Sequence, residues 1–131
     1  MSGYLLDTSV FIAAEQQRPL GQPPPGEARI SVATLTVLGA GVRRAAGKPV
    51  LPLRETTLAR AQRFIALPYD ELVARRLAEL LAATRESGRR AGAMDAIIAA
   101  TALVHDLIIW TQDDDFRVLA ALMPDLRVRH G

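Results

Sequence analysis

Short apolar runs alternate with longer amphipathic segments along this chain, and this alternation limits the folds that it can adopt. Strands are expected over residues 3–7, 64–67, 107–111 and 126–128, with a further candidate at 29–32. Helices are expected over residues 8–14, 33–46, 54–63, 70–86, 95–105 and 114–122. Strands that alternate with helices form a mostly parallel sheet with helices on both faces. The sequence therefore predicts a single domain over residues 1–131, with a three-layer α/β/α fold around a mostly parallel central sheet of four to five strands.

Four aspartates lie where these apolar runs end or where helices are expected to begin: Asp7, Asp95, Asp113 and Asp115. In an open α/β sheet, the carboxyl ends of the strands border one crevice. Carboxylates that converge there repel one another unless a positive charge lies among them, and a hard divalent cation is the usual partner. The positions of these aspartates therefore indicate a possible metal site.

Each aspartate also has an ordinary structural explanation. Asp7 and Asp95 are both placed to cap a helix, although Thr8 or Ser9 could cap the first helix without Asp7. The three consecutive aspartates at 113–115 are harder to explain as a solvated turn, because adjacent carboxylates repel. A common turn could direct the first and third of them to one point while the middle one points away.

Other kinds of site have less support in the sequence. The chain has no cysteine, which excludes disulfides and thiolate metal sites. Its two histidines have no ligand partner at metal-binding spacing, so a zinc site is not expected. There is no glycine-rich phosphate loop, and no serine has a histidine partner at a predictable spacing. A phosphoaspartate mechanism with Asp7 as nucleophile stays open as an alternative, although Ser9 stands where a second acid is expected.

The compartment and the charge pattern can also be read from the sequence. No run of about 18 uncharged apolar residues is present, and the N-terminal stretch lacks the basic start of a signal peptide, so a cytoplasmic protein without membrane contact is expected. Fifteen of the sixteen basic residues are arginines. Arginine suits contacts with phosphates and bases, although solvated helix faces would explain the same composition.

Four segments together resemble the motifs of PIN-domain ribonucleases, and within them the VapC-like toxins of type II toxin–antitoxin systems. The segments are YLLDTSV at 4–10, SVATLTVLGAGV at 31–42, DAIIAATA at 95–102 and TQDDDF at 111–116. Each motif is weak alone, but the four occur in the family's order and cover nearly the whole chain. The resemblance implies a PIN-like fold and a metal-dependent endoribonuclease that hydrolyses RNA phosphodiesters.

The resemblance also implies roles for individual residues. Asp7 and Asp95 correspond to the principal Mg²⁺ ligands of the family, with Mn²⁺ as a possible substitute. Asp113, a third expected ligand, and Asp115 complete the acidic set directly or through water. The hydroxyls of Thr8 and Thr111 are expected nearby in a supporting role.

One position departs from the family pattern. Val37 stands where the second motif normally carries a glutamate. Helix geometry puts position 37 on the same face as Thr34, Ala40 and Gly41, so an acid there is expected to project toward the catalytic pocket. Three explanations stay open: a naturally weakened relative, an enzyme that works with the four aspartates alone, or a substitution that relieved toxicity. Impaired cleavage is therefore expected, and the alternative is a catalytically silent domain that binds RNA or an antitoxin.

The resemblance finally implies partners. A cognate antitoxin and an RNA substrate such as tRNA or rRNA are expected, and a homodimer is plausible because the apolar helices leave more hydrophobic surface than a small sheet covers. The paired arginines Arg43 and Arg44, and Arg89 and Arg90 in the basic loop at 87–92, are the candidates for RNA phosphate contacts.

Overall fold

A computed structural model describes residues 3–131 of the chain. Met1 and Ser2, which belong to the N-terminal stretch considered for a signal peptide, lie outside the described residues. The strands are β1 (Tyr4–Leu6), β2 (Ala28–Ser31), β3 (Ile65–Leu67), β4 (Ile108–Thr111) and β5 (Val128–His130). The helices are α1 (Thr8–Glu15), α2 (Val32–Arg44), α3 (Leu51–Ala61), α4 (Glu71–Glu86), α5 (Ala93–His105) and α6 (Asp115–Leu122).

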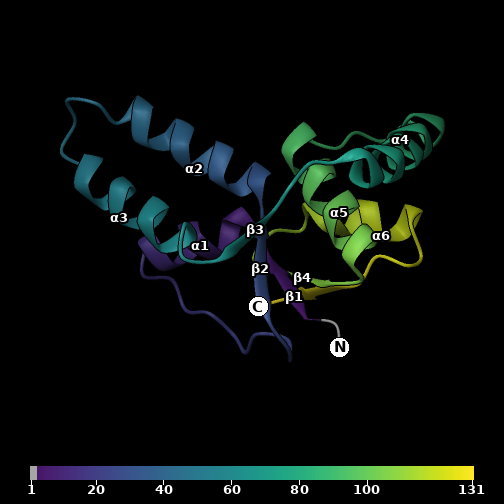
Figure 1. Cartoon of the computed structure of the whole chain (residues 1–131), viewed down its shortest axis with the longest axis horizontal. Coiled ribbons are helices and arrows are strands. Elements are labelled where there is room, and N and C mark those ends of the chain that lie inside the picture. Colours follow the sequence, from purple (N-terminus) through teal and green to yellow (C-terminus); the bar gives the residue numbers. More distant parts are fainter. Residues whose placement is uncertain (1–2) are drawn as a thin grey trace.

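The strands form one five-stranded sheet in the order β3-β2-β1-β4-β5. All four strand pairs are parallel, and Leu6 of β1 lies in register with Trp110 of β4. Helices α1, α2 and α3 lie to one side of the strands and α4, α5 and α6 to the other (Figure 1). The prediction of a three-layer α/β/α fold around a parallel sheet is therefore confirmed.

Two hydrophobic cores fill the spaces between the layers. Neighbouring residues of one strand point to opposite faces of the sheet, so Leu5 and Ile109 are buried among α4, α5 and α6. Leu6 and Trp110, one residue further along the same strands, are buried on the α1 side with Phe11. The continuous apolar sequences of β1 and β4 follow from this burial on both faces.

Helix α1 begins after one of the caps that the sequence indicated. Asp7 is its N-cap, and the Asp7 side chain accepts a hydrogen bond from the backbone N–H of Ser9. Thr8 and Ser9, the alternative caps, lie inside the first turn of the helix. Asp95, by contrast, does not open its helix, because α5 begins at Ala93 after the N-cap Gly92. Asp95 therefore lies in the first turn, where a carboxylate interacts favourably with the helix dipole.

The order of the strands changes direction once, between β1 and β4, and the candidate site lies at this point. From β1 it moves outward to β2 and β3, then returns to β4 on the other side of β1 and continues to β5. In such open sheets ligands bind outside the carboxyl ends of the strands at this switch point. Asp7 follows β1 there, and Asp113 follows β4.

No helix among residues 3–131 is long and apolar enough to cross a membrane. The longest helix, α4, is amphipathic: Leu77 and Leu80 are buried, whereas Leu72 and Leu81 are 57% and 46% exposed. Two apolar side chains of α4 are therefore left on the surface of this protomer.

Candidate active site

Asp7 lies at the carboxyl end of β1 and is 1% exposed. Its backbone N–H donates to the carbonyl of Trp110 at 2.9 Å, which continues the β1–β4 ladder by one residue. Its Oδ2 atom accepts hydrogen bonds from Ser9 Oγ at 2.6 Å and from Thr111 Oγ1 at 2.9 Å. A buried carboxylate without donors would be costly, and these hydroxyls hold Oδ2 at the floor of the crevice.

The same two hydroxyls organise the loop that follows β4. Ser9 Oγ and Thr111 Oγ1 lie 3.1 Å apart. Each hydroxyl has one proton, which it can give to Asp7, and lone pairs that can accept. Ser9 Oγ accepts from the backbone N–H of Gln112 at 2.9 Å, and Thr111 Oγ1 accepts from that of Asp113 at 3.0 Å. The position of the loop is thus tied to the carboxylate of Asp7.

The second oxygen of Asp7 is different. Oδ1 is buried and has no hydrogen-bond partner among residues 3–131. Buried polar atoms are rarely left without a partner, and each exception calls for an explanation. A cation beside Oδ1 would provide one.

The charges of Asp7 and Asp115 both act on two further carboxylates, those of Asp95 and Asp113. The pKa of Asp95 is raised from 3.8 to about 6, first by partial burial and then by the charges of Asp7, Asp115 and Asp113. Burial also raises the pKa of Asp113, reinforced by Asp7, Asp115 and, least, Asp114, and opposed by Arg18. We call Asp7, Asp95, Asp113 and Asp115 the acidic cluster. The structure brings these four predicted residues together at one edge of the sheet.

Asp114, between two members of the cluster, points elsewhere. It pairs with Arg117 one turn along α6, at 2.8 Å between Asp114 Oδ1 and Arg117 Nε, and this hydrogen bond lowers its pKa. Asp114 is not among the charges that raise the pKa of Asp95. Asp114 is thus paired with Arg117, although its charge still contributes to the raised pKa of Asp113.

The donor chemistry of the cluster suits a hard divalent cation, which prefers carboxylate oxygens and keeps several of its waters. A cation would relieve the mutual repulsion of the acids and provide a partner for Asp7 Oδ1. However, no three His, Cys, Asp or Glu side chains in the described part of the chain already form a compact ligand set. The cluster is therefore a concentration of negative charge rather than a finished coordination sphere.

The two supporting threonines have different surroundings. Thr111 donates to Asp7, but Thr8 Oγ1 lies 3.0 Å from Thr34 Oγ1 and joins α1 to α2. The hydroxyl of α1 that donates to Asp7 belongs to Ser9. From the sequence, Ser9 was considered only as a helix cap or a nucleophile, although the DTS tripeptide could have indicated it as a partner of Asp7.

Val37 is half-buried in α2 and lines a cavity of about 180 Å³ together with Glu15, Gly41, Arg44 and Arg54, among others. No member of the acidic cluster lines this cavity. Position 37 is one turn of α2 beyond Thr34. Glu15, which the sequence did not single out, is therefore an acid that shares a cavity with Val37.

The predicted RNA contacts lie outside the acidic cluster. Arg43 and Arg44 are exposed at the end of α2, and Arg89 and Arg90 are exposed in the loop before α5. Arg18, in the loop after α1, is the cation whose charge lowers the pKa of Asp113. Its place in the sequence, inside a proline-rich loop, gave no indication of this proximity.

Comparisons with known proteins identify the family of this chain. Residues 4–122 match the PIN domain family. The chain is 41% identical to ribonuclease VapC4 of Mycobacterium tuberculosis over 125 residues, which is 95% of this chain and 93% of that protein. It is also 41% identical to ribonuclease VapC5 of the same organism over 127 residues, covering 95% and 94% of the two chains.

Solved structures show the same relationship. The chain superposes on VapBC-5 of M. tuberculosis, a member of the VapBC toxin–antitoxin systems, with a TM-score of 0.85, 34% identity and full coverage of both chains. VapBC2 of Rickettsia felis, bound to a DNA fragment from its promoter, has a TM-score of 0.79 at 19% identity over 98% of each chain, and shares the fold. The chain belongs to the PIN-domain family and, within it, to the VapC ribonucleases, which are nuclease hydrolases.

Proposed function

We propose that this protein is the toxin of a toxin–antitoxin pair, an Mg²⁺-dependent endoribonuclease whose acidic cluster holds the metal. PIN ribonucleases generally use divalent metal ions. Asp7, Asp95 and Asp113 are the proposed ligands, and Asp115 completes the negative charge around them. One observation carries this assignment. Asp7 Oδ1 is buried without a hydrogen-bond partner, and the charge of Asp7, with those of Asp113 and Asp115, raises the pKa of Asp95.

A bound divalent ion would supply charge neutralisation and a water of lowered pKa. The protein's own groups prepare the place for it. Ser9 and Thr111 fix Asp7 through Oδ2 and leave Oδ1 free. The raised pKa of Asp95 means that this carboxyl exchanges protons near neutral pH in the metal-free protein. Mn²⁺ accepts the same oxygen ligands and is expected to substitute.

The test is an RNA cleavage assay with Mg²⁺ or Mn²⁺, on the wild type and two matched variants. Asp7→Asn should reduce cleavage by at least roughly 100-fold, because a ligand is expected to matter no less than the groups that support ligands. Asp114→Asn removes a neighbouring carboxylate of the same loop that faces Arg117, and should leave cleavage unchanged. If the wild type cleaves and both variants cleave equally well, the acidic cluster is not the catalytic site.

A second candidate is a catalytically silent PIN domain that binds RNA or antitoxin, and Val37 is the observation that favours it. The side chain at this position can neither bind a metal nor orient water. Cleavage by the wild type in Mn²⁺, set beside that of Val37→Glu, separates the candidates. Activity in the reverted protein alone would support a silent native chain.

The partners follow from the same proposal. An antitoxin is the expected protein partner, because the relatives compared include VapBC toxin–antitoxin complexes. The substrate is proposed to be a structured RNA such as tRNA or rRNA. A homodimer and a cytoplasmic location are also proposed. The exposed apolar side chains of α4, Leu72 and Leu81, are available for contacts between protomers.

A further inference from the structure

Two adjoining cavities lie between α2 and α3 around Gly41, and the first of them also borders α1. The first, of about 180 Å³, includes Glu15, Val37 and Thr57 in its lining. The second, of about 200 Å³, includes Lys48 and Val50. Both are lined by Gly41, Arg44 and Arg54. We call the two together the α2–α3 cavity.

Arg54 is held in this cavity by a buried acid. Glu15 has a side chain only 8% exposed, and its Oε2 lies 3.3 Å from Arg54 Nε. Its Oε1 accepts a hydrogen bond from Thr57 Oγ1 at 2.8 Å. The carboxylate is thus anchored on α3 at two points and keeps the guanidinium from moving freely, which lowers the entropic cost of binding a ligand.

The guanidinium has binding capacity left. Arg54 Nε is buried and faces Glu15, whereas neither Nη nitrogen of Arg54 takes part in the salt bridges of residues 3–131. A Cβ at Gly41 would lie 3.4 Å from Arg54 Nη1, so the absence of a side chain at position 41 gives the guanidinium room against α2. Planar nitrogens in a fixed position suit a bidentate oxyanion such as a phosphate.

The charges around the cavity are unbalanced. Arg44, Lys48 and Arg54 supply three cations, whereas Glu15 is the one carboxylate in the lining of either cavity. Arg44 and Lys48 are exposed and make no salt bridge among the ion pairs of residues 3–131. The excess positive charge favours an anion as occupant.

The direction of α1 and α2 connects this cavity to the acidic cluster. The two helices touch at Thr8 and Thr34, beside Asp7, and further along Glu15 of α1 and Gly41 of α2 line the same cavity. Seven residues separate the two levels on each helix, which is about 10 Å at 1.5 Å per residue. A nucleic acid backbone that leaves the acidic cluster along this seam carries its next phosphates past Val37 toward the three cations.

We propose that the α2–α3 cavity is a phosphate subsite, in which Arg44, Lys48 and Arg54 bind the RNA backbone a few nucleotides from the cleavage point. The proposal rests on RNA as the substrate of the proposed function. It assigns Glu15 and Thr57 as positioning residues, because they hold Arg54 and do not touch the RNA themselves. Arg43 and the loop at 87–92 have no part in this subsite.

The test measures binding of a short, labelled, single-stranded RNA in EDTA, where metal binding and cleavage are both prevented. The double variant Arg44→Ala with Lys48→Ala removes two exposed side chains and should fold normally. We expect it to bind RNA about tenfold more weakly at low salt. The slope of log K against log salt should fall in magnitude by about 0.7 for each phosphate that the variant no longer neutralises.

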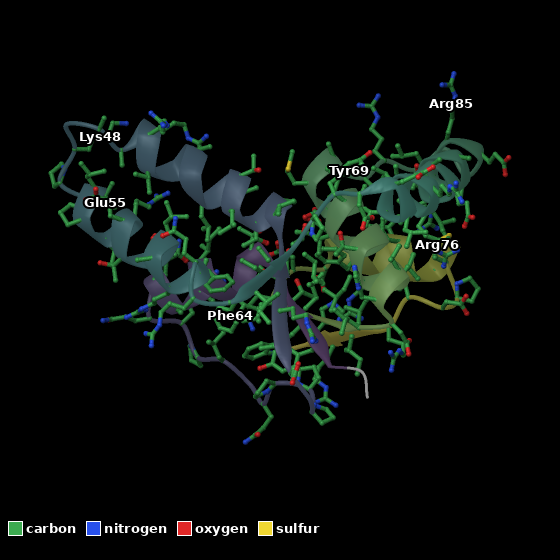
Figure 2. The ribbon with its side chains drawn as sticks, viewed as in Figure 1. Lys48, Glu55, Phe64, Tyr69, Arg76 and Arg85 are labelled. Carbon is green, nitrogen blue, oxygen red and sulfur yellow. The ribbon has the colours of Figure 1, made fainter. Side chains whose placement is uncertain are left out.

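Arg85→Ala is the matched control, because Arg85 projects from α4 at the far end of the molecule from Lys48 (Figure 2). It removes one exposed arginine without touching the cavity. Arg54→Lys is a further variant that keeps the charge beside Glu15 but lacks the planar fork. It should weaken binding without changing the salt slope.

If the double variant binds RNA with the affinity and the salt slope of the wild type, the subsite proposal is wrong. Loss of antitoxin binding in the double variant, with RNA binding unchanged, would also overturn it and identify the cavity as a protein-binding site. These results are independent of the cleavage test. If the double variant loses RNA binding, the subsite is supported even when the wild type cuts no RNA. If the double variant binds RNA normally, the subsite is wrong even when the wild type cuts RNA.

Discussion

Thr111 donates a hydrogen bond to Asp7 at 2.9 Å across 104 positions of sequence. The bond joins the last residue of β4 to the first residue after β1, at the point where the sheet order changes direction. Since Thr111 also accepts from the backbone N–H of Asp113, one hydroxyl connects two members of the acidic cluster. The geometry of the proposed metal site therefore depends on a residue that carries no charge.

Thr111→Val should destabilise the protein by about 1–3 kcal/mol, because it leaves both Asp7 Oδ2 and the N–H of Asp113 short of a buried partner. Denaturant unfolding measures this change. Thr56→Val is the control, since Thr56 is exposed and bonds only to a carbonyl of its own helix; its effect should stay within about 0.5 kcal/mol. Equal effects of the two substitutions would show that the buried hydroxyl has no special role.

Asp95→Asn should stabilise the metal-free protein near neutral pH, with a gain that disappears on acidification. The folded-state pKa of Asp95 is raised from 3.8 to about 6 by burial and by the other acids. Between these values the folded wild type binds the extra proton and the unfolded chain does not, so wild-type stability falls as pH rises through this window. Above pH 6 Asp95 is ionised in the folded protein, where burial and the other acids disfavour its charge. The neutral asparagine carries no charge and avoids this cost.

Unfolding midpoints measured from pH 4 to pH 8 test this dependence, with Asp125→Asn, an exposed site, as control. The difference between Asp95→Asn and the wild type should grow with rising pH and level off above pH 6. A difference that is constant with pH would mean that neither burial nor the other acids raise the pKa of Asp95 on folding. In a metal-bound protein the difference should shrink or change sign, because the ion favours the ionised carboxylate.

Val37→Glu should increase Mg²⁺ affinity and RNA cleavage, because it places an acid where the family pattern has one, one turn of α2 beyond Thr34. Isothermal calorimetry measures the affinity, and Val37→Gln, which has the same length without the charge, is the control. The cavity beside position 37 also contains Arg44 and Arg54. Unchanged Mg²⁺ binding together with a more stable fold would show that the new carboxylate pairs with these arginines instead.

Gly3→Ala should destabilise the protein by about 1–3 kcal/mol, the usual cost of forcing extra atoms into a filled space. A Cβ at Gly3 would collide with the backbone of Glu27, which accepts a hydrogen bond from Tyr4 at the start of the β1–β2 pair. Gly39→Ala is the matched change in α2, where a Cβ meets nothing within 4 Å. The free energy of unfolding of this control should rise by up to about 1 kcal/mol, because alanine is the better helix former. A thermal melt of the two variants distinguishes these opposite signs.

Much of the fold was predictable because its elements have local signals. The apolar runs of β1 and β4 are short and uninterrupted, which is typical of strands buried on both faces. The amphipathic period of α4 and the alanine-rich α5 marked two helices clearly. The first residues of helices were harder to predict, because several possible caps can lie next to each other. Asp7, Thr8 and Ser9 could each cap the helix after β1, and the structure selects Asp7.

Helix α4 shows a limit of periodicity. The helix carries leucines at positions 72, 77, 80 and 81, yet of these only Leu77 and Leu80 are buried. A hydrophobic stripe can be wider than the surface that covers it, and the width of that surface depends on where α5 and α6 lie. Leu72 and Leu81 remain exposed in this protomer for that reason.

The sequence by itself determined which residues carry charge and at which element ends they stand, and so which four aspartates could form a site. Tertiary structure decided what surrounds them. It gave Asp7 one satisfied oxygen and one unpartnered oxygen, turned Asp114 toward Arg117, and placed Val37 beside Glu15 and Arg54. Burial and partner distance depend on contacts between segments remote in sequence, and no local pattern encodes those contacts. The acids were readable in the chain; their environments exist only in the folded protein.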